Sequence, residues 1–107
     1  MKLSTRQQQL YDAFYQSTHN NDVLDPQTEL LVGLSAAIAS NCEPCTAYYL
    51  QLCRKNGVSF PQIQAVLAKV MAVAAGQKRL QTERAMRECH IQPDHFAKEP
   101  NAEGVRE

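Results

Sequence analysis

The chain has 107 residues, enough for one ordinary domain, and 44% of them are hydrophobic, which is typical of a globular protein. Basic and acidic residues are equal at 11 each, so no charge field indicates a nucleic-acid or a membrane-surface partner. Residues 1–7 lack the apolar run of a signal peptide, and no segment approaches the roughly 18 apolar residues of a membrane helix. We therefore expect a single-domain cytoplasmic protein with no nucleic-acid and no membrane partner.

Two helices are predicted in the first 40 residues. An apolar stripe at helical spacing predicts the first over residues 4–18; its members are Leu10, Tyr11, Phe14 and Tyr15. The second helix begins after Asp25, which can cap it, with Pro26 at the first helical position. Small residues at 33 and 35–37 would let a neighbouring helix approach this one closely.

Two further helices follow. The third begins at Asn41 or Cys42, with Asn41 as the predicted N-cap, and ends at residue 56, before Gly57 as a left-handed stop. The fourth opens with Ser59 and Gln62 spaced as in a capping box and runs to about residue 88. Its amphipathic stripe consists of Ile63, Val66, Leu67, Val70, Met71 and Ala74.

The tail, residues 91–107, is mostly polar and contains two prolines, so we expect a loose arm or one that packs on a neighbouring subunit. Alternating runs of strand-forming residues are absent from the sequence. The predicted fold is therefore all-α, a single helical-bundle domain over residues 1–107 with its core at about 4–90.

The motif that carries chemistry is the cysteine pair Cys42 and Cys45. Two cysteines three residues apart on a helical turn bring their sulfur atoms close enough for a disulfide. Unpaired N–H groups and the positive end of the dipole at a helix N-terminus both favour the thiolate. One thiolate can then attack a peroxide or a disulfide while the other cysteine resolves the product.

Two other interpretations of the pair stay open. It is half of a zinc site if further ligands come from Cys89, His90 or His95, although no second paired-ligand spacing supports this. Alternatively, both cysteines simply pack in a core, which their position at a helix start disfavours. The sequence predicts no cofactor and no bound metal.

Two polar residues accompany the pair as candidates. Tyr49 lies one helical turn after Cys45, so its phenol can hydrogen-bond to a sulfur, a peroxide oxygen or a water, or it is a core aromatic. Glu29, near the start of the second helix, either interacts with the helix dipole or accepts a proton near the cysteines. Tyr48 is interpreted as a core or interface aromatic, Cys53 as a small buried hydrophobe and Cys89 as an incidental thiol. We assign no role to the three histidines.

The segment ELLVGLSAAIASNCEPC, residues 29–45, and the Gly-Val-Ser step at 57–59 resemble the carboxymuconolactone decarboxylase superfamily, specifically its alkylhydroperoxidase AhpD-like branch. The resemblance covers residues 29–79, and the Cys-x-x-Cys motif favours the redox branch because the decarboxylases generally lack it. It implies an all-helical fold that assembles into trimers or hexamers, and disulfide-linked reduction of peroxide with a glutamate and a histidine moving the proton.

The resemblance also implies roles for the site residues. It casts Cys45 as the attacking sulfur and Cys42 as the resolving one, whereas the helix dipole alone favours Cys42, so both remain candidates. Tyr49 stands where the family has its histidine, and Glu29 is one residue further from the first cysteine than in the usual pattern.

We therefore expect an oxidoreductase that reduces a peroxide or disulfide substrate with an unidentified thiol reductant and works as a homo-oligomer. The alternative is a non-catalytic helical oligomer that binds a ligand or partner and carries a regulatory or vestigial cysteine pair.

Overall fold

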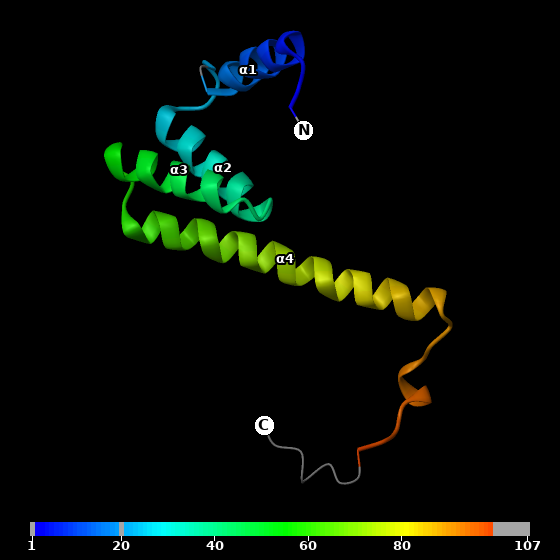
Figure 1. The fold of residues 1–107 in the computed structure, drawn as a ribbon. Helices are drawn as coiled ribbons and strands as arrows, with labels where there is room; N and C mark the ends of the chain where they lie inside the picture. The colour runs from blue at the N-terminus through cyan, green and yellow to red at the C-terminus, as the bar shows by residue number, and fades with distance from the viewer. Residues whose placement is uncertain (1, 20, 100–107) are drawn as a thin grey trace. The chain divides into compact units, whose positions relative to one another are not determined.

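A computed structural model of the chain describes residues 2–19 and 21–99. These residues form α1 (Thr5–His19), α2 (Pro26–Ala39), α3 (Glu43–Lys55), α4 (Phe60–Glu88) and a short 3-10 helix, η1 (Pro93–His95). Figure 1 shows the elements in chain order, from α1 in blue to η1 in orange. No strand occurs among the described residues, which confirms the all-α prediction for that part of the chain. The end of the predicted arm, residues 100–107, lies outside the described residues.

The helix boundaries arise from local capping that the sequence predicts. Asp25 caps α2 because its carboxylate accepts hydrogen bonds from both the backbone N–H and the hydroxyl of Thr28, at 2.9 and 2.8 Å. Ser59 and Gln62 form the predicted capping box at α4, each side chain accepting from the other's backbone N–H. Gly57, with φ of 77°, ends α3 in the left-handed conformation.

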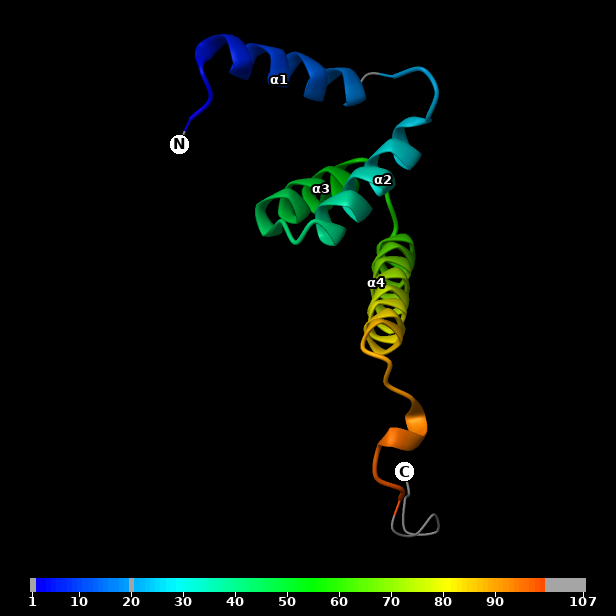
Figure 2. The ribbon, with the colours of Figure 1, turned by 90° about the vertical axis from the view of Figure 1, so that its right-hand side faces the viewer.

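Helices α2 and α3 pair as a hairpin that holds the core of the site-bearing part of the chain. They lie side by side in both Figure 1 and Figure 2. The buried residues are Leu34 and Ala37 from α2 and Tyr49 and Cys53 from α3. Partly buried residues pack around them: Leu30, Ile38, Leu52, Val58, Ile63 and Val66. The first turns of α4 thus cover the hairpin with apolar side chains, and their burial supplies the hydrophobic stabilisation of this core.

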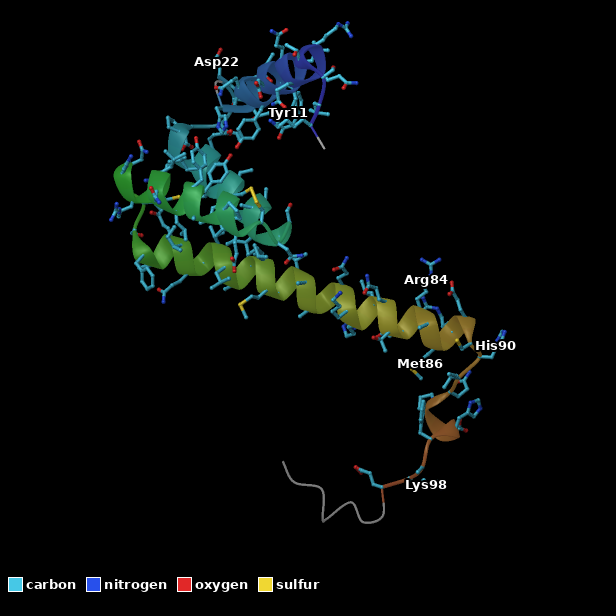
Figure 3. All side chains as sticks on the ribbon, in the orientation of Figure 1. Tyr11, Asp22, Arg84, Met86, His90 and Lys98 are labelled. Carbon is cyan, nitrogen blue, oxygen red and sulfur yellow. A yellow bond between two sulfur atoms is a disulfide. The ribbon has the colours of Figure 1, made fainter. Side chains whose placement is uncertain are left out.

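The chain divides into two units, residues 1–70 and 71–107. The first contains α1, α2, α3 and the start of α4, and it carries all the predicted site residues. The second contains the rest of α4, where Arg79–Glu83 and Arg84–Glu88 form exposed ion pairs one helical turn apart. Figure 3 labels Arg84 on this part of α4. The single domain expected from the sequence stays a prediction.

Two helices present apolar side chains that the described residues leave uncovered. Neither α1 nor α4 contains a fully buried residue. On α1, Phe14 is 67% exposed, and on α4 the stripe residues Leu67 and Met71 are exposed. Among the described helices, none is long and apolar enough to cross a membrane.

Candidate functional site

The turn between α2 and α3 sets the position of the cysteine pair. The N–H of Cys42 donates to the carbonyl of Ala37 at 3.1 Å, and the N–H of Asn41 donates to that of Ile38 at 3.0 Å. These two backbone hydrogen bonds form a Schellman motif, in which Asn41 adopts the left-handed conformation at φ 59°. The prediction that Asn41 is the N-cap of α3 is therefore wrong. Asn41 ends α2 because asparagine tolerates positive φ better than most residues.

Cys42 itself is the N-cap of α3. Its sulfur accepts a hydrogen bond from the backbone N–H of Cys45 at 3.2 Å, in the place that a serine or aspartate oxygen usually takes. Pro44, in the first turn between the two cysteines, has no N–H, so it cannot compete for that sulfur. Unpaired N–H groups at a helix start stabilise negative charge, so this geometry favours a thiolate at Cys42 in the reduced protein.

Cys42 and Cys45 are joined by a disulfide, with their Cα atoms 5.2 Å apart (the yellow bond in Figure 3). The backbone therefore already holds the pair at bonding distance, as the spacing predicts. Cys45 is exposed, whereas Cys42 is partly buried.

An open groove of about 730 Å³ leads to Cys42. Its walls come from the end of α2, from α3 and from the start of α4, and its lining is mostly apolar; the lining includes Ile38, Cys42, Leu50, Ile63 and Leu67. Cys45 does not line it. A molecule in this groove would therefore contact Cys42 and not Cys45.

Tyr49 is 9% exposed and belongs to the core, as one of its two interpretations expected. Its ring lies directly against Gly33 of α2, where a Cβ atom would fall 2.6 Å from the ring carbon Cζ. The hydroxyl groups of Tyr49 and Tyr15 are hydrogen-bonded at 3.2 Å. Burial and this hydrogen bond raise the pKa of Tyr49 well above its ordinary value. The phenol therefore stays protonated at neutral pH and works as a hydrogen-bonding group, not as a free base.

Glu29 lies in the first turn of α2, far from the turn that holds the cysteines. Ten residues, roughly 15 Å of helix, separate it from the last residue of α2. Its carboxylate accepts a hydrogen bond from the Asn21 side chain at 3.2 Å, and its charge contributes to the raised pKa of Tyr49. The structure thus brings Glu29 into the surroundings of Tyr49, and no hydrogen bond joins it to either cysteine among the described residues.

His19 joins this cluster, although no role was expected for it. Its imidazole meets the ring of Tyr15 edge to face, with centroids 4.6 Å apart, and lies 6.4 Å from the ring of Tyr49. Its Nε2 atom is buried and has no hydrogen-bond partner among the described residues. The spacing of Tyr15 and His19 predicts a shared face of α1, but no local signal shows that this face meets α3.

The remaining cysteines and Tyr48 differ in their exposure to solvent. Cys53 is 1% exposed, which confirms the prediction of a buried thiol, and burial raises its pKa. Cys89 is exposed. Tyr48 is half exposed, so it is not a core residue of this chain. The described residues contain no group of three histidine, cysteine or carboxylate side chains placed to hold a metal ion.

These features define an all-helical protein whose helical hairpin holds a cysteine pair at its turn. A sequence model of the carboxymuconolactone decarboxylase family matches residues 7–88, which is most of the chain. The chain therefore belongs to this family, which includes AhpD-like proteins. Comparisons with curated proteins and with solved structures found no match.

Proposed function

We propose that the protein reduces peroxides or disulfides by cycling Cys42 and Cys45 between the dithiol and the disulfide, with an external thiol as reductant. The observation that carries this proposal is the cysteine pair at the N-terminus of α3, where the sulfur of Cys42 caps the helix and Cys45 is an exposed residue. Membership of a family that includes AhpD-like proteins supports it. We place the cycle in the cytoplasm, where thiol reductants return such disulfides to the dithiol.

Cys42 is the attacking sulfur in this proposal, because it receives the Cys45 N–H and faces the apolar groove. Its thiolate attacks the terminal oxygen of a hydroperoxide, the O–O bond breaks, and Cys42 becomes a sulfenic acid while the leaving alkoxide takes a proton to form an alcohol. The thiol of Cys45 then attacks the sulfur of that sulfenic acid, forming the disulfide and releasing water. This order reverses the one that the family resemblance implies.

An external thiol closes the cycle. Its thiolate attacks one sulfur of the Cys42–Cys45 disulfide and forms a mixed disulfide, and a second thiol group displaces the protein sulfur. Two thiols are oxidised for each peroxide or disulfide reduced, so electrons balance over the cycle. The reductant approaches the exposed sulfur of Cys45 without entering the groove.

The test uses the reduced protein, freed of reductant and mixed with an apolar organic hydroperoxide. We expect wild type to consume one peroxide per protein and to end as the disulfide. C42S should consume none, and C45S should consume one and stop at the sulfenic acid, which a dimedone-type trap and mass spectrometry detect. C89S, which alters an exposed thiol outside the pair, is the matched control and should behave as wild type.

The outcomes separate the proposal from its alternative. Wild-type protein that consumes no peroxide would remove the redox function and leave a non-catalytic helical protein that binds a ligand or partner. A C42S protein that still reacts, together with an inert C45S, would instead restore the cysteine roles implied by the family.

We also propose a homo-oligomer, a trimer or hexamer, as the working form. The uncovered apolar side chains of α1 and α4 support this, since Leu10, Tyr11 and Phe14 of α1 are all more than half exposed. Figure 3 labels Tyr11 on this helix. Light scattering coupled to gel filtration measures the mass directly, and a monomer at micromolar concentration would contradict the proposal.

A further inference from the structure

The groove beside Cys42 carries its charge at a single position. Among the described residues that line it, Glu43 is the one with a charged side chain, and that side chain is exposed. The rest of the lining is apolar or neutral, and the Thr46 hydroxyl already donates to the carbonyl of Cys42 at 2.9 Å. No ion pair joins the Glu43 carboxylate to a basic side chain in the described part of the chain. A molecule that enters the groove therefore meets an uncompensated negative charge at the residue after Cys42.

The start of α3 does not offset this charge, although helix N-termini usually attract anions. Most of its backbone donors are used or missing. Cys42 donates its N–H to the carbonyl of Ala37, and Cys45 donates its N–H to the sulfur of Cys42. Pro44 has no N–H to offer. The helix dipole supplies the equivalent of about half a positive charge, whereas the carboxylate of Glu43 carries a full negative one, so this end of the groove is negative in sum.

The remainder of the groove is suited to hydrocarbon. Leu50 follows Cys42 by eight residues, about 12 Å of helix, and it lines the same groove. Ile63 and Leu67 contribute apolar side chains from α4. Transfer of apolar surface from water to such walls is favourable. The groove thus combines apolar walls with one carboxylate close to the reactive sulfur.

We propose that Glu43 is a specificity-determining residue, which keeps anionic peroxides and disulfides from Cys42 so that the groove takes neutral, apolar ones. This inference rests on the proposed function, since it names the class of substrate that reaches the same sulfur. A substrate with a carboxylate near its reactive bond would bring two negative charges together beside Cys42. A neutral substrate meets no such repulsion and buries its hydrocarbon part along Leu50 and Ile63.

The test measures the reactivity of Cys42 with matched reagents that differ in charge, and it needs no peroxidase turnover. In reduced C45S/C89S protein, Cys42 is the accessible thiol because Cys53 is buried. Methyl methanethiosulfonate is neutral, its sulfonatoethyl analogue is anionic and its trimethylammonioethyl analogue is cationic. With each reagent the Cys42 thiolate attacks the sulfenyl sulfur, a mixed disulfide forms and methanesulfinate leaves.

Each rate is divided by the rate of the same variant with the neutral reagent, which removes any change in the reactivity of the thiolate itself. We expect E43Q to raise the normalised rate of the anionic reagent about threefold to fivefold and to lower that of the cationic reagent by a similar factor. E43K should extend both changes in the same direction. Discrimination between the charged reagents should shrink at about 1 M salt, where the Debye length is about 3 Å.

Asp22 supplies a matched control, and Figure 3 labels it. It precedes α2 whereas Cys42 follows it, and the helix between them is roughly 20 Å long. D22N removes the same charge as E43Q but does not alter the groove lining, so its normalised rates should equal those of the parent protein.

A second measurement examines the apolar walls. L50Q should lower the rate of benzyl methanethiosulfonate relative to the methyl reagent by at least about threefold, because the benzyl group loses an apolar contact. V32Q, which changes an exposed side chain outside the groove lining, should leave that ratio unchanged. An unchanged ratio in L50Q would overturn the assignment of the groove to apolar substrates.

Circular dichroism of each variant checks that the helices are retained. The charge selection is overturned if E43Q and the parent protein agree within about 1.5-fold for both charged reagents, or if D22N changes the normalised rates as much as E43Q does. Charge selection in a protein that consumes no peroxide would remove the proposed catalysis and keep the role of Glu43. Peroxide consumption without charge selection would keep the catalysis and remove that role.

Discussion

Substituting alanine for Gly33 would place a methyl group where the ring of Tyr49 now lies. The new Cβ atom would fall 2.6 Å from Cζ and 2.8 Å from Cδ1 of that ring, whereas carbon atoms pack at about 3.5–4.0 Å. The ring cannot yield freely, because it is buried and its hydroxyl is hydrogen-bonded to Tyr15. Overpacking of this kind costs about 1–3 kcal/mol, and alanine regains about 1 kcal/mol through its helix propensity. We expect G33A to destabilise the protein by about 1 kcal/mol net.

The effect of G33A on the free energy of unfolding should change sign when the ring of Tyr49 is absent. In a Y49V background no side-chain atom remains at the clash position, so G33A should stabilise by up to about 1 kcal/mol. The double-mutant cycle, measured by urea unfolding and circular dichroism at low temperature, should give a coupling of about 2 kcal/mol. Equal effects of G33A in both backgrounds would refute the close packing of α2 on Tyr49.

Three further predictions follow from individual side chains. Glu43 places a negative charge beside the capping sulfur, so E43Q should raise the alkylation rate of reduced Cys42 about twofold to fivefold, and an unchanged rate would count against a thiolate there. Iodoacetamide at neutral pH should modify Cys89 and spare buried Cys53, as peptide mass spectrometry can verify; a labelled Cys53 in native protein would contradict its burial. The pKa of Tyr49 is raised in the folded protein, so above about pH 10 the folded state keeps the phenol proton that the unfolded chain loses. The free energy of unfolding should therefore not depend on Tyr49 ionisation below about pH 10 and should fall above it. Urea unfolding should show that Y49F lacks this fall.

The parts of the fold that the sequence predicts correctly are governed by local chemistry. Asp25, Ser59 and Gly57 act within one turn of their own positions, so their residue types suffice to predict the helix boundaries. Asn41 was misassigned because asparagine suits both an N-cap and a left-handed helix end. The two uses differ only in a backbone angle that the sequence does not display.

The site is predictable only in part, for a different reason. Cys42 and Cys45 are neighbours in sequence, so their spacing alone predicts that they can bond. His19 and Tyr49 are 30 residues apart, and their proximity depends on how α1 packs against α3. The amphipathic stripe of α4 is a second example. The helical spacing of its apolar residues predicts an apolar face, but Leu67 and Met71 remain exposed in the single chain. The spacing does not indicate which surface packs against them.

The sulfur that begins α3 also has a consequence for the energetics of the whole hairpin. A thiolate accepts a hydrogen bond more strongly than a disulfide sulfur does. Reduction of the pair therefore stabilises the first turn of α3, and oxidation to the disulfide destabilises it. The folding of α3 and the affinity of the two sulfurs for electrons are therefore thermodynamically linked. A mutation that frays this end of the helix should make the protein a weaker oxidant, even if it touches neither cysteine.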